Sequence, residues 1–151
     1  MAAAGLTSGA FYSHFRSKSE LLEAVVDGEL KRSIGLFSNT SLAQALAAVE
    51  SYLSPSHVSH PESGCVVPAL APEIARASGS TKRSFEQGVL GLKDQIRKRV
   101  DSDAQAWSIL SQLVGAVMVA RGLPSEKQQK ALLKGVNQQV NEILERTPAA
   151  T

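Results

Sequence analysis

The sequence has 151 residues, of which 43% are hydrophobic and 20% charged, with a formal net charge of +2 at pH 7. This is the composition of an ordinary globular chain with enough apolar residues for a core, and so small a net charge does not by itself indicate nucleic-acid binding. The single cysteine, Cys65, excludes an internal disulfide and a metal site built from clustered cysteines.

The first strong helical pattern begins near Lys18 and continues to about Ser38. Its apolar stripe contains Leu22, Val26, Leu30, Ile34 and Phe37. Ser17 and Glu20 fit a capping box, in which the Ser17 hydroxyl accepts from the Glu20 amide and the Glu20 carboxylate reaches back to the Ser17 amide. A long helix is therefore predicted over about 18–38.

The next segment contains two shorter helices with a loop between them. A second helix is predicted over 42–53, and Pro55 ends it. The polar stretch 56–64 contains a proline and a glycine and is predicted to be a loop. A short, irregular helix is predicted over about 65–78, and Pro72 inside it is expected to produce a kink.

Three further apolar stripes with helical spacing cover 85–100, 107–118 and 133–144, separated by capping and stop residues. The basic run over 82–99 is interpreted as a solvated helix face, which is the usual explanation of such runs. Period-two alternation is essentially absent. The sequence therefore predicts an all-α bundle.

The segment before the first long helix carries a specific motif. A short helix is predicted from Ser8 to His14, with Thr7 as its N-cap. The order of elements is Gly5-Leu6-Thr7, then Phe11 to Phe15 with Tyr12 after the first phenylalanine, then Lys18 to Leu21. This order and spacing resembles the helix-turn-helix of the TetR family of regulators, whose signature is glycine-hydrophobe-Ser/Thr, hydrophobe-Tyr-x-x-Phe and Lys-x-x-Leu.

The resemblance implies that the start of the helix from Ser8 to His14 enters the major groove of double-stranded operator DNA. Small residues there let the backbone approach, and hydroxyl groups can reach base edges or phosphates. The candidate DNA-binding residues are Thr7, Ser8, Gly9, Ala10, Tyr12, Ser13, His14 and Lys18. The alternative for Tyr12 and His14 is that they only pack within an amphipathic helix.

The resemblance also implies two domains: a partial helix-turn-helix domain with its connecting helix at 1–38, and a regulatory domain at 39–151. In such a TetR-like bundle, the regulatory domain encloses an effector pocket, and its last two helices pair with a second copy. The predicted effector-pocket residues are Tyr52, Cys65, Phe85, Trp107 and Met118. The predicted dimer-interface residues are Leu110, Val114, Val117, Val136, Val140 and Ile143. A plain monomer core is the alternative for any one of them.

The implied function is a dimeric transcriptional repressor that a small apolar or aromatic molecule releases from its operator. The alanines after Met1 resemble the last turn of the family's second helix. The first helix and most of the second are therefore expected to be missing, through shortening or a misplaced start, and operator binding by residues 1–151 is expected to be poor. The alternative is a helical dimerisation module without DNA binding.

Cys65 provides another alternative, a regulator that senses oxidants or electrophiles through a thiol. It is predicted to begin a helix, where the helix dipole lowers the pKa of a thiol. Packing is the preferred interpretation, because the segment from Gly64-Cys65 to Ala69-Leu70 resembles a common form of this domain. The spacing of His57, His60 and Cys65 matches no known metal cluster, so no metal is expected.

No enzymatic activity and no cofactor are expected. Catalysis needs a nucleophile with a base, or paired carboxylates in a cleft, and the three histidines, His14, His57 and His60, form no such set with the scattered acids. The chain shows no signal peptide, and no apolar run approaches the about 20 residues needed to span a bilayer. A cytoplasmic chain without membrane contact is therefore expected.

Overall fold

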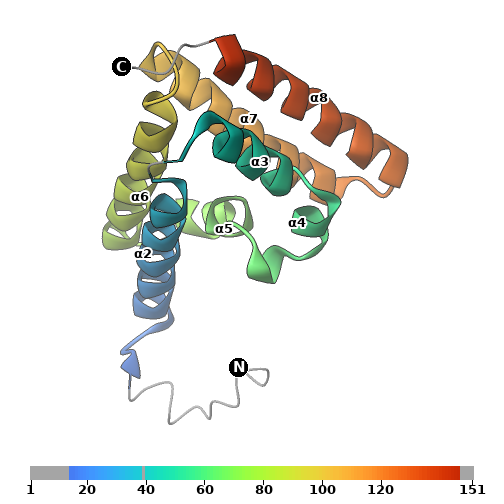
Figure 1. The fold of residues 1–151 in the computed structure, drawn as a ribbon. Coiled ribbons are helices and arrows are strands. Elements are labelled where there is room, and N and C mark those ends of the chain that lie inside the picture. The colour runs from blue at the N-terminus through green and yellow to red at the C-terminus, as the bar shows by residue number, and fades with distance from the viewer. Residues whose placement is uncertain (1–13, 39, 147–151) are drawn as a thin grey trace.

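The computed structural model describes residues 14–38 and 40–146, and the regular elements of this part are all helices, as the sequence predicts (Figure 1). The elements are α2 Lys18–Phe37, α3 Leu42–Tyr52, α4 Pro55–Ser59, the 3-10 helix η2 Pro61–Ser63, α5 Val66–Ala75, α6 Gly79–Arg97, α7 Asp103–Gly122 and α8 Glu126–Arg146. The long helices predicted around 18–38, 85–100, 107–118 and 133–144 are thereby confirmed.

The stretch 56–64, predicted to be a loop, contains α4 and η2 instead. Ser54 caps α4 by accepting a hydrogen bond from the His57 amide at 3.2 Å, and Pro55 lies in the first turn, where its missing N–H costs nothing. Val58 is buried among the other helices. Short helices held by a cap and one buried side chain carry too few residues to show a helical period.

Capping hydrogen bonds set the beginnings of α2 and α3. The Glu20 amide donates to the Ser17 hydroxyl at 3.1 Å, as predicted. The Glu20 carboxylate accepts from the Arg16 amide at 2.7 Å rather than from the Ser17 amide, so the predicted reciprocal bond is wrong by one residue. A complete capping box occurs at Ser41 and Gln44, at the start of α3.

The helices α2 and α6 run parallel and side by side (Figure 1). Their axes approach closely because two glycines of α6 face large side chains of α2. A Cβ atom added at Gly88 would lie 2.6 Å from Leu30 Cβ, and one at Gly91 would lie 3.2 Å from Ile34 Cγ1. At the start of both helices, the Ser80 hydroxyl donates to the Glu23 carboxylate at 2.7 Å. We call Gly88 and Gly91 with Leu30 and Ile34 the glycine seat.

The apolar core consists of two clusters. One joins α3, α4, α7 and α8, and its fully buried members include Ile109, Val117 and Val140. The other joins α2, α5 and α6 around Val26, Leu30 and Leu92. α7 contributes to the first cluster and packs Leu110 and Val114 against the second.

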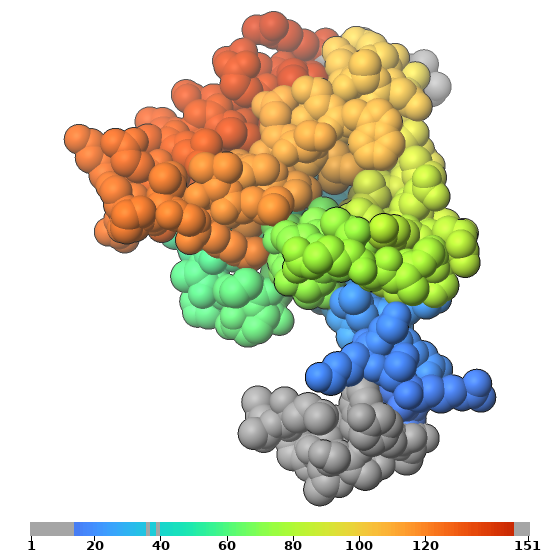
Figure 2. Space-filling model, turned by 180° about the vertical axis from the view of Figure 1, so that it is seen from behind, coloured from blue at the N-terminus to red at the C-terminus, as the bar shows by residue number. Residues whose placement is uncertain are grey.

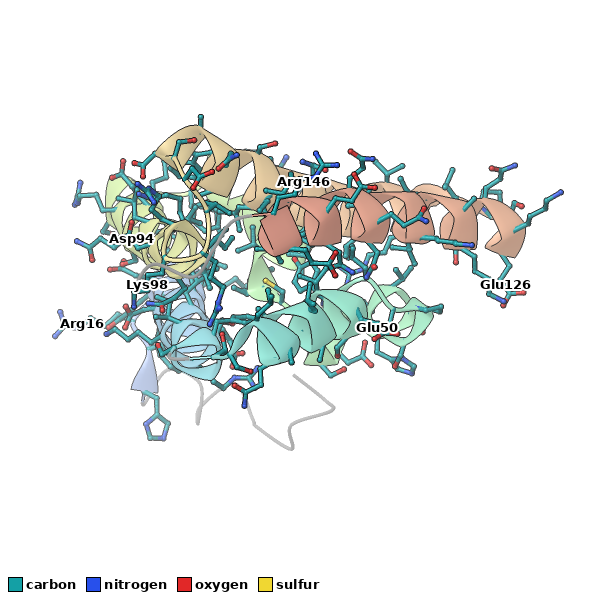
Figure 3. All side chains as sticks on the ribbon, turned by 45° about the horizontal axis from the view of Figure 1, so that its top comes forward. Arg16, Glu50, Asp94, Lys98, Glu126 and Arg146 are labelled. Atoms are coloured by element: carbon teal, nitrogen blue, oxygen red, sulfur yellow. The ribbon has the colours of Figure 1, made fainter. Side chains whose placement is uncertain are left out.

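The last two helices form one side of the molecule. Residues 123–125 join α7 to α8, and the two helices lie side by side (Figure 1). Figure 3 shows Glu126 and Arg146 at opposite ends of α8, with Arg146 on the side of α6, where Asp94 and Lys98 lie. α3, which carries Glu50, packs against the inner side of α8.

Candidate functional site

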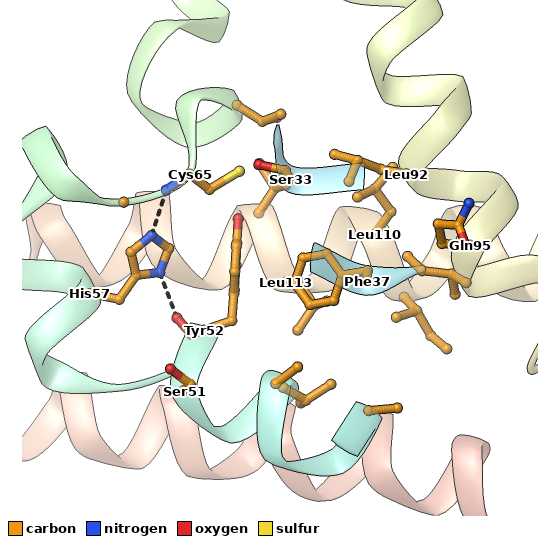
Figure 4. A pocket seen from close by; sticks show the side chains of 18 of the residues that line it. Ser33, Phe37, Ser51, Tyr52, His57, Cys65, Leu92, Gln95, Leu110 and Leu113 are labelled. Carbon is orange, nitrogen blue, oxygen red and sulfur yellow. Dashed lines mark hydrogen bonds between the residues drawn. The ribbon is translucent and has the colours of Figure 1, made fainter. Parts of the chain in front are cut away.

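A cavity of about 600 Å³ lies between the two apolar clusters, and it is the candidate functional site (Figure 4). Its walls come from the end of α2, from α3, from the segment 54–65, and from α6 and α7, with smaller contributions from α5 and α8. The apolar lining includes Phe37, Val49, Val67, Leu92, Ile96, Leu110, Leu113 and Val114. The polar lining includes Arg32, Ser33, Ser51, Tyr52, Gln95 and Arg99.

Tyr52, at the end of α3, forms part of the wall between the cavity and the segment 54–65. Figure 4 shows its ring with the hydroxyl directed between Cys65 and Ser33. The hydroxyl oxygen is buried and has no oxygen or nitrogen hydrogen-bond partner among the described residues. Burial raises the pKa of Tyr52 above its usual range, and Cys65 adds to the effect. The phenol therefore stays neutral, and its hydroxyl has no oxygen or nitrogen acceptor; the thiol of Cys65, a weak partner, is the side chain that interacts with it.

His57 holds the segment 54–65 against α3. Its Nδ1 lies 2.7 Å from the Tyr52 carbonyl oxygen, and its Nε2 lies 3.0 Å from the Cys65 amide nitrogen. The carbonyl can only accept and the amide can only donate, so the neutral ring carries its proton on Nδ1. Gly64 passes so close to this ring that a Cβ atom would clash with it. Arg121 of α7 adds hydrogen bonds to the His57 carbonyl at 3.0 Å and the Val58 carbonyl at 3.1 Å.

Cys65 lies at the N-cap of α5 and lines the cavity. Burial raises the pKa of its thiol above the ordinary value of 9.0 and outweighs the lowering effect of the Val67 backbone hydrogen bond. The sequence-based expectation that the helix start lowers this pKa is therefore wrong. A thiol that stays protonated at neutral pH is a poor nucleophile, which favours the packing interpretation of Cys65.

The charged groups of the cavity are both arginines. Arg32 is exposed and pairs with the Glu29 carboxylate at 2.6 Å, outside the lining. Arg99 is half-buried, and its Nη2 donates to the Thr40 hydroxyl at 3.1 Å. No carboxylate side chain is among the described residues that line the cavity. The cavity therefore carries a net positive charge.

Of the predicted pocket residues, Tyr52 and Cys65 line the cavity, and the other three do not. Phe85 packs against the cluster of α2, α5 and α6. Trp107 and Met118 are each 40% exposed on the outer side of α7. All three residues therefore lie outside the pocket. Trp107 and Met118 do so because α7 turns a different side toward the cavity, and Phe85 because its part of α6 packs against the second cluster.

The predicted dimer-interface residues lie mainly inside the single chain. Leu110 and Val114 line the cavity, and Val117 and Val140 are fully buried, with 0% exposure. Val136 and Ile143 are half-buried and pack against the same core. The apolar stripes of α7 and α8 are therefore largely used within the monomer, and their outward sides differ from the predicted interface.

Most of the predicted DNA-binding residues, Thr7 to Ser13, lie outside the described residues. His14 and Lys18 are exposed, and Lys18 begins α2. The sequence analysis missed Arg99 as a cavity residue. A signal was available, because Arg99 lies three residues after Ile96 and seven after Leu92, on the apolar stripe of α6 rather than on the solvated side.

The described residues contain no group of three or more His, Cys, Asp or Glu side chains that could hold a metal ion. The search for membrane-spanning segments found no candidate among the helices that the structure describes.

Comparison with known proteins connects this fold with the sequence motif. The family model described as bacterial regulatory proteins, tetR family, matches residues 1–25. No curated protein matches the chain. The matched segment contains the helix-turn-helix motif and runs into α2, which packs along the helical body. The chain therefore carries, in its first 25 residues, a segment similar to the helix-turn-helix DNA-binding domain of tetR-family bacterial regulatory proteins, and this segment is joined to an all-helical body.

Proposed function

We propose that the chain is a dimeric, ligand-responsive repressor, which leaves its operator when a small molecule occupies the cavity between the two apolar clusters. The observation that carries this proposal is the double role of α2. Its first residues belong to the segment that matches the family's DNA-binding domain, and its last residues, Ser33 and Phe37, line the cavity. One helix therefore connects the DNA-binding segment with the wall of the cavity.

The cavity supports a small apolar effector. Its volume of about 600 Å³ falls in the range of about 300–1,000 Å³ that is usual for ligand pockets. Its walls are mainly apolar, with a few polar groups that can orient a ligand. A ligand shifts α2 only by binding one arrangement of the helix more tightly than another. Phe37, in direct contact with the cavity, is the side chain best placed to sense the difference.

The outward side of α7 supports dimerisation. Trp107 and Met118 are 40% exposed and Val119 is 55% exposed, all on this helix. A Cβ atom at Gly115 on α7 or at Gly135 on α8 would meet nothing within 4 Å, so a partner helix could approach closely at both positions. Figure 2 shows that no other described element covers α7 on this side. Exposed apolar surface of this kind is typical of an interface between symmetric copies.

Filling the cavity without any ligand tests the proposal. Leu113→Trp adds bulk to the cavity wall, whereas Leu90→Trp adds the same ring to a side chain of α6 that is 40% exposed. We expect Leu113→Trp to weaken binding to DNA from upstream of the protein's own gene by about tenfold, since about 1.4 kcal/mol of bias toward the released arrangement suffices. Leu90→Trp should leave the affinity unchanged.

The measurement is fluorescence anisotropy at one fixed salt concentration, because protein–DNA affinities depend steeply on salt. Circular dichroism confirms that each variant is folded.

Lys18→Gln should weaken binding to all DNA sequences to a similar degree and make the affinity depend less steeply on salt. A folded Leu113→Trp variant with wild-type affinity would contradict the coupling between cavity and DNA. A wild-type protein that binds no DNA, and on which Lys18→Gln therefore has no effect, would favour the alternative of a helical dimerisation module without DNA binding.

A further inference from the structure

The cavity contains one cation whose charge is not neutralised within the described residues. Three other cations of α2 and α6 are paired: Arg32 with Glu29 at 2.6 Å, Lys93 with Asp94 at 2.6 Å, and Arg97 with Asp103 at 3.3 Å. Arg99 forms no ion pair within this part of the chain. The hydrogen bond of its guanidinium within the described residues goes to a neutral group, the Thr40 hydroxyl.

Arg99 lines the cavity, and unlike the other lining cation, Arg32, it has no carboxylate partner among the described residues. It is half-buried, and it follows the end of α6 on the same stripe as Leu92 and Ile96, which also line the cavity. A partly desolvated guanidinium without a counter-charge is costly unless an anion approaches it. The Thr40 hydroxyl engages Nη2 and so restrains the orientation of the group. A guanidinium held in this way is suited to bind a carboxylate through two parallel hydrogen bonds.

The remainder of the cavity accepts an apolar body and no second charge. Figure 4 shows Gln95 on one side and Tyr52 with Cys65 on the other, with Phe37, Leu110 and Leu113 between them. Near Tyr52, the guanidinium of Arg121 is already hydrogen-bonded to two backbone carbonyls. The site therefore combines the one unpaired positive charge of Arg99 with mainly apolar walls.

We propose that the effector of this pocket is an apolar monocarboxylate, whose carboxylate binds Arg99 and whose hydrocarbon or aromatic body packs on Phe37 and Leu113. The inference rests on the proposed effector-binding function. It goes further because it assigns a negative charge to the ligand and names Arg99 as the residue that binds the charged group. Neutral analogues of the same shape gain the apolar contacts but leave Arg99 without an anion.

Calorimetric titration with matched pairs of probes tests the inference. Decanoate is compared with decanol, and naphthoate with naphthalenemethanol. We expect the wild type to bind at least one acid about tenfold more tightly than its alcohol, which is the scale of a charge-assisted hydrogen bond. Arg99→Met keeps most of the apolar stem, removes the charge, and should reduce the affinity for the acid to that for the alcohol. Arg99→Lys should restore part of the difference.

Arg97→Met is the matched control, because Arg97 is a nearby arginine of α6 that pairs with Asp103 and does not line the cavity; this variant should keep the preference for acids. Equal binding of acid and alcohol by the wild type, or an acid preference that survives in Arg99→Met, would overturn the inference but leave an effector pocket standing. Failure of all four probes to bind would overturn it as well. An acid that binds through Arg99 without changing DNA affinity would support the inference and contradict the proposed release from DNA.

Discussion

Tyr52, in the wall of the cavity, carries a buried hydroxyl group that has no oxygen or nitrogen acceptor among the described residues and only the weakly accepting Cys65 thiol beside it. A hydroxyl in water keeps its hydrogen bonds, so burial without a partner costs free energy in the folded state. The ring of the same residue is well placed. It stacks edge-on against His57 with a centroid distance of 4.6 Å. The apolar part of Tyr52 therefore stabilises the fold, while its polar atom opposes it.

We predict that Tyr52→Phe stabilises the protein without ligand. The variant keeps the ring and removes the unpartnered oxygen, so the free energy of unfolding should rise by about 1 kcal/mol. Thermal unfolding should then show a midpoint higher by about 2–4 °C. Tyr52→Leu, which loses the ring contact with His57 as well, should be less stable than Tyr52→Phe. A lower midpoint for Tyr52→Phe would mean that the hydroxyl has a partner in solution.

The half-buried thiol of Cys65 predicts a defined pH dependence of stability. Because burial raises its pKa above 9.0, the folded protein holds this proton to higher pH than the unfolded chain does. The stabilising contribution is therefore complete below pH 9, and it is lost as the pH rises through the folded pKa. At pH 8, iodoacetamide should alkylate the folded protein about tenfold more slowly than the urea-unfolded chain, since the thiolate is the reactive form. Equal rates would restore the thiol-sensor alternative.

At the scale of elements, the glycine seat decides how α2 and α6 pack. Glycine in the middle of a helix costs about 0.5–1 kcal/mol relative to alanine. At Gly88 this cost is offset by the close approach of Leu30, which a Cβ atom would prevent. Gly28 provides a contrast on α2 itself, because a Cβ atom there would meet nothing within 4 Å.

We predict opposite effects for alanine at these two glycines. Gly88→Ala should lower the free energy of unfolding by about 1–3 kcal/mol, since an extra methyl group in a packed contact forces the helices apart. Gly28→Ala should raise it by about 0.5–1 kcal/mol through better helix propensity. Urea unfolding of both variants measures the difference. If Gly88→Ala were as stable as Gly28→Ala, the close contact between α2 and α6 would not exist in solution.

The elements were more predictable from the sequence than the site. Caps such as Ser17 and stripes at helical spacing are local, so they identify the long helices. α7 is apolar on several sides, and spacing alone cannot decide whether Trp107 or Leu110 faces inward. That choice follows from packing against α5, α6 and α8. The hydrogen bond between the His57 ring and the Cys65 amide, eight residues apart, likewise belongs to no regular element and has no signature in the sequence.

At the scale of the whole molecule, the exposed apolar side chains are unequally distributed. Trp107, Met118 and Val119 gather on the outward side of α7, whereas Leu90 is isolated on α6. Single exposed apolar residues are common on monomers, but a group of them along one helix is typical of an interface. A charged side chain substituted at an exposed apolar position of α7 should therefore weaken dimerisation, whereas one substituted at Leu90 of α6 should not.

We predict that Met118→Glu disrupts a homodimer and Leu90→Glu does not. Both side chains are 40% exposed in the single chain, so the two variants should be equally stable as monomers. Burying an unpaired carboxylate in the interface opposes association. Sedimentation velocity should show monomers for Met118→Glu and dimers for the wild type and Leu90→Glu. Dimers of unchanged affinity in Met118→Glu would place the interface elsewhere.

The glycine seat also has a mechanical consequence. It contacts α2 at Leu30 and Ile34, near the end of the helix that reaches the cavity. At 1.5 Å per residue, about 10 Å of helix separates Leu30 from Phe37, and about 18 Å separates it from Lys18. If α2 rotates as a rigid helix about Leu30, its two ends move in opposite directions. A displacement of Phe37 then gives a displacement of Lys18 that is nearly twice as large. The Glu23–Ser80 hydrogen bond opposes such a motion, and under the proposed function it sets part of the free energy that an effector must supply.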